Sequence, residues 1–283
     1  MKIKDVFEKT VQFFKDKNID TARLDTELLM AFALKIDRVQ IYMKYEQPLS
    51  DTEVGVCREL VRRRAGGEPI AYIIGEKGFY GEIFSVGPGV LIPRPETELI
   101  VEQALEFIKK RGLQVPTILD LGAGSGCIGF SIIKNCKDAK LTSVEKSSQA
   151  FEYLKANQEK LNLVERSSLI CDSVANLKFS ENEFDIVVAN PPYIAKNDSQ
   201  TEAMVHKFEP HEALYAEDDG LSDLTSWARK GRSWLKEPGM MLFEMGHLQG
   251  PKMKEFFESL GGFKEVKILK DLSGLDRVIK SIQ

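Results

Sequence analysis

The sequence lacks the usual marks of a disulfide-linked or zinc-binding protein. Its four cysteines are scattered without a C-x-x-C pair, which suits a reducing compartment and argues against structural zinc. Its three histidines also lack metal-ligand spacing, so we expect packing or surface roles for them and predict no metal site. The residues concerned are Cys57, Cys127, Cys136, Cys171, His206, His211 and His247.

The sequence also lacks a long hydrophobic run and an excess of positive charge. No apolar stretch long enough for a membrane span follows the charged N-terminus, so we expect no signal peptide, no membrane span and a cytoplasmic location. The net charge of -4 and the pI near 5.7 argue against a strongly basic nucleic-acid surface, although a local one stays open. The chain of 283 residues, 43% hydrophobic and 29% charged, has the composition of a soluble globular protein with room for two domains.

Residues 1–67 show the apolar spacing of helices. Thr21 and either Ser50 or Asp51 are candidate caps, and Gly66-Gly67 ends the last helix of this segment. We predict a small helical bundle that docks the substrate. The side chains at helical spacing in its first two helices are Val6, Phe7, Thr10, Phe13, Phe14, Leu24, Leu28, Leu29 and Phe32.

The predicted bundle is close to neutral. Residues 1–82 hold 14 Lys and Arg against 14 Asp and Glu. Arg62-Arg63-Arg64 is the one basic cluster. It lies at a predicted helix C-terminus, where cations oppose the negative end of the helix dipole, so a structural role is favoured and a docking patch is the minor alternative.

The pattern changes twice after the bundle. Residues 68–93 alternate like strands and predict a β-hairpin linker. From residue 94 to residue 283, strands and helices alternate, as in an α/β domain with a parallel sheet and right-handed crossovers. We expect strands at 118–121, 141–144, 168–170, 186–189, 240–244, 264–269 and 276–282, and helices at 97–111, 126–135, 147–160, 221–235 and 252–260.

The most informative stretch is Asn190-Pro191-Pro192-Tyr193, which follows the apolar run 186–189. That run indicates a buried parallel strand, and open α/β sheets bind ligands where such strands end. Each proline holds the preceding residue extended and lacks an N–H, so the turn is stiff and rich in carbonyl acceptors. Asn190 adds a side-chain oxygen and Tyr193 a flat ring. Together they suit a substrate with an –NH2 group; a turn chosen only for rigidity is the less favoured alternative.

A second motif is the glycine-rich segment 119–126, which lies between a predicted strand and its helix and lets backbone approach a ligand closely. From Gly124 onwards the glycines also fit the G-x-G-x-x-G dinucleotide pattern. Two features favour S-adenosylmethionine instead. The carboxylate of Asp120 would repel a pyrophosphate but attract an ammonium or sulfonium, and the dinucleotide register begins two residues late.

Two acidic residues at strand ends are further candidates for binding the cofactor. Glu145 ends the second strand of the domain, 19 residues beyond Gly126, where a carboxylate can accept the ribose hydroxyls. Asp172 ends the third strand and could reach the adenine amino group, or it could simply cap a helix. The segment Pro93–Glu98 is equally open, because its prolines and acids fit a capped helix start as well as a functional role.

Five segments together resemble the HemK/PrmC family. Its members are the N5-glutamine methyltransferases that modify the Gly-Gly-Gln glutamine of peptide-chain release factors. The resemblance covers nearly the whole chain, and the combination is specific, whereas Asn-Pro-Pro-Tyr alone also resembles turns of DNA and RNA amino-methyltransferases. The segments are Pro93–Glu98, Asp120–Gly126, Asn190–Tyr193, Phe208-Glu209-Pro210 with Ala213-Leu214, and Asp218–Leu221.

The resemblance implies a Rossmann-like class I methyltransferase sheet of seven strands with the last one antiparallel. It also implies S-adenosyl-L-methionine as cofactor, class I release factors as substrates, and a glutamine amide held by Asn190 and the Pro191 carbonyl. The expected catalytic residues are Asn190, Pro191, Pro192 and Tyr193. The expected cofactor-binding residues are Gly122, Ala123, Gly124, Ser125, Gly126, Glu145, Asp172, Ser173 and Asn190.

The chain departs from the family pattern at two of these positions. Glu145 stands where Asp is usual, which lengthens the reach to the ribose. Ser173 stands where some members carry an aromatic beside adenine. Both departures concern the affinity for the cofactor.

Two other functions stay open. One is a nucleic-acid methyltransferase that uses the same turn on an exocyclic base amine; the acidic pI and the neutral bundle argue against it. The other is a cofactor-binding scaffold without turnover, against which the intact Asn190 and glycine loop argue.

Overall fold

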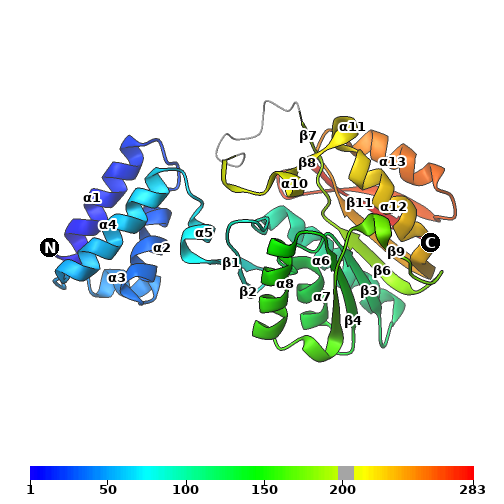
Figure 1. Ribbon diagram of the computed structural model, residues 1–283, viewed down its shortest axis with the longest axis horizontal. Helices are drawn as coiled ribbons and strands as arrows, with labels where there is room; N and C mark the ends of the chain where they lie inside the picture. The colour runs from blue at the N-terminus through cyan, green and yellow to red at the C-terminus, as the bar shows by residue number, and fades with distance from the viewer. Residues whose placement is uncertain (197–206) are drawn as a thin grey trace. The chain divides into compact units, whose positions relative to one another are not determined.

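The structure is a computed structural model that describes residues 1–196 and 207–283 (Figure 1). The chain divides into two compact units, Met1–Glu76 and Lys77–Gln283. Each unit contains its own clusters of buried apolar side chains. The functional division of the chain stays a prediction, with its parts at 1–67, 68–93 and 94–283.

The N-terminal unit is a helical bundle, as the apolar spacing predicts. Ser50 begins its longest helix with a capping box: its hydroxyl accepts from the Glu53 amide at 3.3 Å, and the Glu53 carboxylate accepts from the Ser50 amide at 2.8 Å. Phe7, Phe14 and Leu29 are among the buried side chains of its core. The helices are α1 (Ile3–Asp16), α2 (Ala22–Leu34), α3 (Arg38–Met43), α4 (Asp51–Ala65) and α5 (Ile70–Ile74).

The apolar face predicted for α2 is wrong in part. Leu24 and Phe32 are 42% and 45% exposed. The helix instead buries Asp25, whose carboxylate forms an ion pair with Arg64 at 2.7 Å. A buried carboxylate needs such a partner, so a polar contact between two helices decides which face of α2 turns inward.

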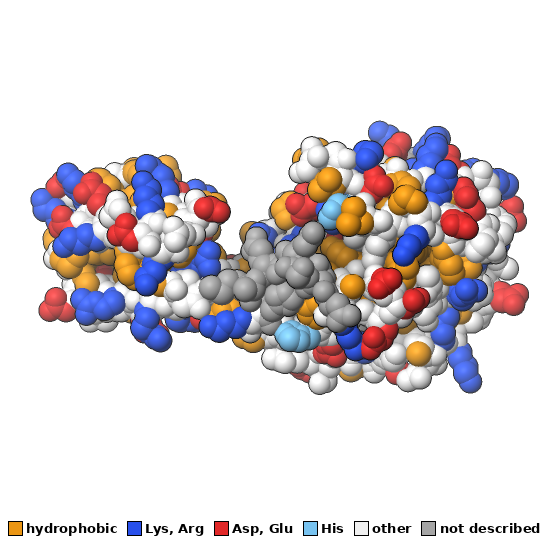
Figure 2. Space-filling view, turned by 90° about the horizontal axis from the view of Figure 1, so that it is seen from above, with side chains coloured by type: hydrophobic (Ala, Val, Ile, Leu, Met, Phe, Trp, Pro, Cys, Tyr) orange, Lys and Arg blue, Asp and Glu red, His pale blue; other side chains and the backbone are white. Residues whose placement is uncertain are grey.

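The basic cluster of α4 is fully paired. Each of its three arginines forms an ion pair within the unit, which supports the structural role over a docking patch. Figure 2 agrees, because positive and negative side chains are interspersed over the visible face of this unit, on the left. The pairs are Arg62–Glu59, Arg63–Glu68 and Arg64–Asp25.

The predicted hairpin is present but shorter than expected. Its strands, β1 (Glu76–Phe79) and β2 (Glu82–Ser85), form a two-stranded sheet. The residues just before it were expected to be extended but form helix α5. This short helix follows Pro69, and Gly75 ends it with a φ of 83° that favours glycine.

The larger unit is built on a seven-stranded sheet. Its strands are β3 (Thr117–Leu121), β4 (Lys140–Glu145), β5 (Ser167–Cys171), β6 (Phe184–Ala189), β9 (Leu235–Glu244), β10 (Glu265–Lys270) and β11 (Asp276–Ile282). They lie in the order β10-β11-β9-β6-β3-β4-β5, and only β11 runs antiparallel to its neighbours. This confirms the predicted α/β fold of seven strands with the last one antiparallel.

Helices cover both faces of this sheet (Figure 1). The longer helices are α6 (Glu98–Arg111), α7 (Cys127–Asn135), α8 (Ser148–Lys160), α12 (Ser222–Trp234) and α13 (Gly250–Ser259). Short segments near the carboxyl ends of the strands are η1 (Pro95–Thr97), η3 (Val174–Asn176), β7 (Ile194–Ala195), α10 (His211–Leu214), β8 (Tyr215–Ala216) and α11 (Glu217–Gly220), and η2 (Val164–Arg166) precedes β5. The predicted polar segment 196–219 is therefore partly structured, and its residues 197–206 lie outside the described part of the chain.

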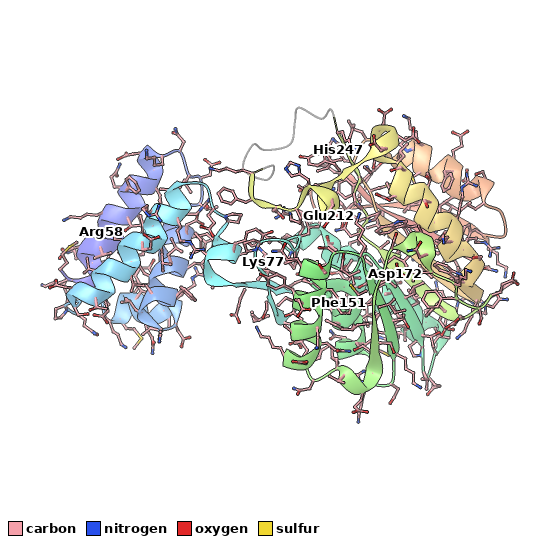
Figure 3. All side chains as sticks on the ribbon, viewed as in Figure 1. Arg58, Lys77, Phe151, Asp172, Glu212 and His247 are labelled. Carbon is pink, nitrogen blue, oxygen red and sulfur yellow. The ribbon has the colours of Figure 1, made fainter. Side chains whose placement is uncertain are left out.

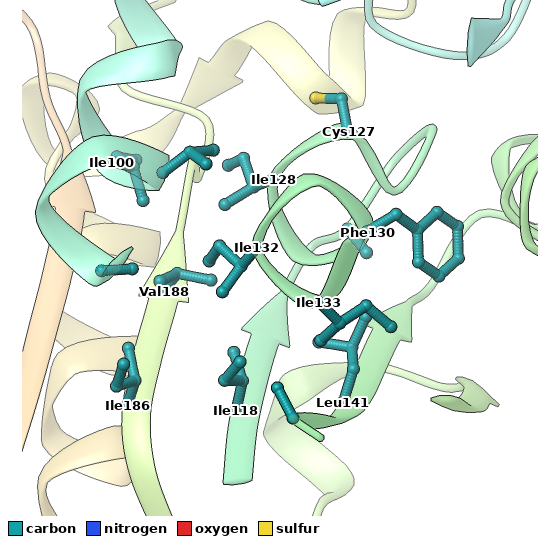
Figure 4. Close-up of a cluster of buried hydrophobic side chains, with 14 of the residues drawn as sticks. Ile100, Ile118, Cys127, Ile128, Phe130, Ile132, Ile133, Leu141, Ile186 and Val188 are labelled. Carbon is teal, nitrogen blue, oxygen red and sulfur yellow. The ribbon is translucent and has the colours of Figure 1, made fainter. Parts of the chain in front are cut away.

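The alternating side chains of the strands divide the core into two halves. On one face, Ile118, Ile186 and Val188 pack with side chains of α6 and α7 such as Ile100 and Ile132 (Figure 4). The intervening strand residues pack with α12 and α13 on the other face; they include Leu119, Val187, Met241 and Phe243. This two-sided burial explains why the strands are almost continuously apolar.

The parallel register brings four strand ends together. Leu121 of β3 is paired with Val144 of β4 and Ala189 of β6, and Ala189 is paired with Phe243 of β9. The residues that directly follow these paired positions therefore lie together at one edge of the sheet. The residues that follow are Gly122, Glu145, Asn190 and Glu244.

Candidate active site

A cavity of about 120 Å³ lies at this carboxyl edge. Its wall includes the turn after β5 and the helix α10, marked in Figure 3 by the labelled Asp172 and Glu212. Most of the predicted site residues line it. They are Gly122, Gly124, Ser125, Glu145, Asp172, Ser173, Asn190 and Pro192.

The glycine loop turns sharply from β3 into α7. Gly124 has a φ of 56°, in the region that favours glycine. Two backbone bonds hold the turn: the Ala123 amide donates to the Val144 carbonyl at 2.9 Å, and the Gly126 amide donates to the Ala123 carbonyl at 2.8 Å. Ala123 and Gly126 thus shape the loop, and Gly122, Gly124 and Ser125 form the cavity wall.

Glu145 is bound to the loop by its carboxylate. One oxygen accepts from the Gly124 amide at 2.9 Å and the other accepts from the Ser147 amide at 2.8 Å. Burial raises the pKa of Glu145, and the two backbone donors oppose that rise. The extra methylene of Glu, compared with Asp, therefore lets the side chain reach Gly124 across the loop.

Asp172 lines the cavity and also organises the turn after β5. Its Oδ1 accepts from the Ser173 amide at 2.7 Å and from the Asn176 side chain at 2.8 Å. The Ser173 hydroxyl accepts from the Ala175 amide at 3.2 Å, which caps η3. The cap of η3 is therefore Ser173 and not Asp172, and the contact of Asp172 with adenine stays a prediction.

Asp120, whose carboxylate was expected to attract a cationic cofactor, does not line the cavity. The side chain is fully buried beneath the loop, and its Oδ2 accepts from the Gly129 amide at 3.0 Å. Its Oδ1 is buried without a partner in the described residues. Burial raises the pKa of this carboxyl to about 7.

The Asn190–Tyr193 turn is joined to the sheet by a chain of side-chain hydrogen bonds. Asn190 Nδ2 donates to the Thr97 hydroxyl at 3.4 Å, and that hydroxyl donates to Glu244 at 2.6 Å. The Tyr193 hydroxyl donates to the other oxygen of Glu244 at 3.1 Å. Burial raises the pKa of Glu244, whereas the Thr97 hydroxyl, the charge of Arg277 and the Tyr193 hydroxyl lower it.

The far end of the turn is held by two segments from later in the chain. Gln249 Nε2 donates to the Tyr193 carbonyl at 2.9 Å. Gly220, with a φ of 83°, approaches the same carbonyl so closely that a Cβ would lie 2.1 Å from its oxygen. Only glycine fits there, which explains its place in the Asp218–Leu221 segment.

A second cavity of about 180 Å³ adjoins the first at Asn190. Tyr193 and Glu244 line the second cavity only, whereas Leu91, Arg94, Asn190 and Ala213 line both. Asn190 therefore stands between the cavity beside the glycine loop and the cavity beside the tyrosine ring. Such an arrangement suits transfer of a group from one ligand to another.

A partly buried ion pair lies beside both cavities, because its Arg94 lines each of them. The Arg94 guanidinium bonds the Glu209 carboxylate, and the other oxygen of Glu209 accepts from the Ile92 amide at 3.2 Å. Glu209 is only 5% exposed. The pair fastens the segment Phe208–Pro210 to the segment Pro93–Glu98, so two motifs of unknown role in the sequence become one structural unit.

The sequence did not identify Trp227 as a site residue, but it lines the first cavity. Its ring lies against Gly122, where a Cβ would be 2.6 Å from the ring. Trp227 follows Leu224 by three residues on the sheet-facing side of α12, and α12 begins close to the carboxyl edge. The helical periodicity together with the position in the first half of α12 is the signal that could have found it.

Within residues 1–196 and 207–283, no group of three or more His, Cys, Asp or Glu side chains could hold a metal ion. His206 lies outside the described residues. His211 belongs to α10 and contacts the Tyr215 ring, and His247 lies in the loop after β9 (Figure 3). The search over these same ranges finds no helix long and apolar enough to cross a membrane.

Comparison with known proteins identifies the family. Residues 5–75 match the family model of the PrmC N-terminal domain, and residues 98–218 match that of the methyltransferase small domain. The chain is 33% identical over 277 residues to the release factor glutamine methyltransferase of Rhodopirellula baltica, covering 97% of this chain and 94% of that one. This chain belongs to the release factor glutamine methyltransferase family.

Other comparisons agree with that assignment. The family member of Leptospira interrogans is 37% identical over 282 residues, covering 97% of this chain and 96% of that one. Among solved structures, the hMettl16 catalytic domain in complex with the MAT2A 3′UTR hairpin 6 covers 70% of this chain and 74% of its own, with 16% identity and a TM-score of 0.54. That similarity shows the fold alone. These comparisons confirm the resemblance to the HemK/PrmC family. They also confirm S-adenosylmethionine as the cofactor of this methyltransferase.

We expect Asp120 to make the stability of the protein depend on pH. The folded state raises its pKa from 3.8 to about 7, so its contribution to stability is complete below the unfolded pKa and is lost as pH rises through 7. In Asp120→Asn this loss disappears. Urea titrations give the free energy of unfolding of each protein. The value for Asp120→Asn minus the value for wild type should therefore increase by about 2 to 3 kcal/mol from pH 5 to pH 8.

Exposed Asp138 provides the matched control, because Asp138→Asn changes the same charge on the surface of the same unit. If the difference between Asp120→Asn and wild type stays constant across this pH range, Asp120 does not carry a raised pKa.

Proposed function

We propose that the protein transfers a methyl group from S-adenosylmethionine to the side-chain amide nitrogen (N5) of the glutamine in the Gly-Gly-Gln motif of peptide-chain release factors. The observation that carries this proposal is the position of Asn190 on the wall of both cavities. The first cavity holds the cofactor beside the glycine loop. The second receives the acceptor amide beside the Tyr193 ring.

In this mechanism the Asn190–Tyr193 turn orients a poor nucleophile. The lone pair of an amide nitrogen is delocalised into its carbonyl, so the nitrogen needs acceptors that hold its hydrogens and favour the positive charge that develops on it. Asn190 Oδ1 and the Pro191 carbonyl supply those acceptors, and the rigid Pro191-Pro192 pair fixes their spacing. S-adenosylmethionine supplies a methyl group on an electrophilic sulfonium. No general base is assigned, because the proton can leave after the methyl group has arrived.

The cofactor is held by the loop at Gly122–Gly126 and by Glu145, whose carboxylate accepts the ribose hydroxyls. Glu145 and Asp172, together with Glu212 and Asp223, give this cavity four acidic side chains against the basic Arg94 and Lys146. A wall with more acid than base suits a ligand that carries a sulfonium and an ammonium.

Trp227 supplies the aromatic surface for adenine that Ser173 cannot provide. It lies in the same cavity wall as Asp172 and Ser173, on the neighbouring helix. The departure at Ser173 is therefore compensated from α12, and the adenine subsite keeps an aromatic ring at a different position in the chain.

The acceptor is a protein loop rather than a nucleic acid. The Asn190–Tyr193 turn grips any –NH2 group, so the choice of substrate depends on the remaining surface. The N-terminal unit is near neutral and its three clustered arginines are paired, whereas binding to a polyanion rests on phosphate neutralisation. This favours class I release factors, with the N-terminal unit docking the body of the factor, and a cytoplasmic location follows from that substrate.

Cofactor binding should depend on the absence of a side chain at Gly124. A Cβ there would meet only Val90, at 3.8 Å, so a larger side chain would project into the cavity. We expect Gly124→Val to weaken S-adenosylmethionine binding by at least about 10-fold in calorimetry, because it fills space that the ligand needs.

Gly112→Val is the matched control for Gly124→Val. Gly112 also has a positive φ, of 63°, but it ends α6 with no atoms within 4 Å of its Cβ position. The Gly112→Val variant therefore has the same backbone strain as Gly124→Val, but at a position away from the cavity. Unchanged affinity in a folded Gly124→Val protein would place the cofactor elsewhere.

Trp227 should report cofactor binding through its fluorescence. The chain has only two tryptophans, and the other, Trp234, is 5% exposed. We expect S-adenosylmethionine to quench the fluorescence of Trp227. In Trp227→Phe the quenching should vanish while the affinity is largely kept. Trp227→Ala should lose about 5- to 100-fold in affinity, since stacking of a base on a ring contributes about 1 to 3 kcal/mol. Persistent quenching in Trp227→Phe, or full affinity in Trp227→Ala, would contradict the role.

A competition for label tests the function itself. The enzyme is given labelled S-adenosylmethionine with equal amounts of unmodified release factor, its Gln→Ala variant, genomic DNA and ribosomal RNA. Label should enter only the unmodified release factor, and Asn190→Ala should slow its entry by about 100-fold or more, because one preorganised hydrogen bond to the transition state is lost. Label in a nucleic acid would support the base methyltransferase, and no label anywhere would support the scaffold.

A further inference from the structure

The buried carboxylate of Glu244 is not explained by cofactor or substrate binding alone. It is 1% exposed at the end of β9, in the wall of the acceptor cavity. Burying a carboxylate is costly unless its oxygens are hydrogen-bonded. Its two hydrogen-bond partners among the described residues are the hydroxyls of Thr97 and Tyr193, so one oxygen is joined to the Asn190–Tyr193 turn directly and the other through Thr97.

The chemistry of these groups determines the direction of each hydrogen bond. The Thr97 hydroxyl donates its single proton to Glu244 Oε2 at 2.6 Å. The hydroxyl then offers only lone pairs to Asn190. Asn190 must therefore turn its Nδ2 towards Thr97, at 3.4 Å, and its Oδ1 the other way.

We propose that Glu244 and Thr97 are positioning residues that orient the Asn190 amide, so that Oδ1 and not Nδ2 faces the acceptor –NH2. The inference rests on the proposed function for the identity of that acceptor. A flipped Asn190 would present donors to donors and lose the grip on the amide. The Glu244 side chain thus acts at a distance of two hydrogen bonds and touches no reacting atom.

Tyr193 completes the arrangement on the other side of Glu244. Its hydroxyl donates to the second carboxylate oxygen at 3.1 Å, so the proton of that hydroxyl is engaged by Glu244. One carboxylate therefore sets the orientation of the first and the last residue of the Asn190–Tyr193 turn.

A series of variants separates orientation from simple structural support. Thr97→Val keeps the shape but removes the hydroxyl, and Glu244→Gln lets the hydroxyl donate in either direction. We expect each to lower kcat by about 10-fold or more, with the KM for the acceptor and the Kd for S-adenosylmethionine within about 3-fold of wild type. Thr97→Ser, which restores the hydroxyl, should recover most of the kcat lost in Thr97→Val.

Thr225→Val is the matched control. Thr225 lies in the same unit and donates its hydroxyl to the Leu221 carbonyl at 2.9 Å, away from both cavities. Thr225→Val loses a hydroxyl, as Thr97→Val does, and we expect its kcat to stay within about 2-fold of wild type. Equal kcat in Thr97→Val and Thr225→Val would overturn the proposal.

A double-mutant cycle with Asn190→Ala gives the decisive kinetic readout. If Thr97 acts only through the Asn190 amide, Thr97→Val should cost nothing further once that amide is absent. Additive losses would show that Thr97 supports the fold instead. The cycle is measured with the acceptor that takes the label in the competition assay. If that acceptor is a nucleic acid, the proposed function is wrong, but the cycle still tests whether Thr97 orients Asn190.

Nitrogen-15 NMR decides the same question without turnover. The side-chain amide signals of Asn190 are assigned by their loss in Asn190→Ala. They should shift in Thr97→Val and in Glu244→Gln but not in Thr225→Val. Unmoved signals in the first two variants would refute the orientation by Glu244 even if no acceptor were labelled.

Discussion

The site depends first on the parallel register of the central strands. The pairings of Leu121 with Val144 and Ala189, and of Ala189 with Phe243, bring four strand ends to the same level. A slip of one residue in any of these strands would turn its side chains to the opposite face and move its last residue away from the edge. The two halves of the apolar core prevent such a slip, because each strand is buried on both faces.

The polar groups at this edge are positioned by bonds to the backbone and to each other. Glu145 is held by the amides of Gly124 and Ser147, and Glu209 by Arg94 and the Ile92 amide. A buried acid with satisfied oxygens is rigid as well as charged. The site therefore combines a field that favours a cationic cofactor with side chains whose directions are set before any ligand binds.

Much of this could be predicted from the sequence, because the informative signals are local. Strand and helix periods gave the order of elements in the larger unit, and the residues just after apolar runs gave Gly122, Glu145, Asp172 and Asn190 as candidates, all of which line one cavity. A parallel sheet sends the carboxyl ends of its strands to one edge, so position along the chain determines position in space. The stiffness of Asn190–Tyr193 likewise follows from two consecutive prolines.

Other features were decided only by tertiary structure. Asp120 was expected to attract a cationic cofactor but lies buried with its carboxylate bonded to α7. Helix α2 turns Asp25 inward instead of Leu24 because Arg64 is there to pair with it. The contacts of Asn190 with Thr97, of Thr97 with Glu244 and of Arg94 with Glu209 join residues 93, 147 and 115 positions apart. The sequence determined which groups stand at the strand ends, since that depends on local periodicity. Which of them touch, and therefore which way Asn190 points and which helix supplies Trp227, depends on packing between elements that no local pattern encodes.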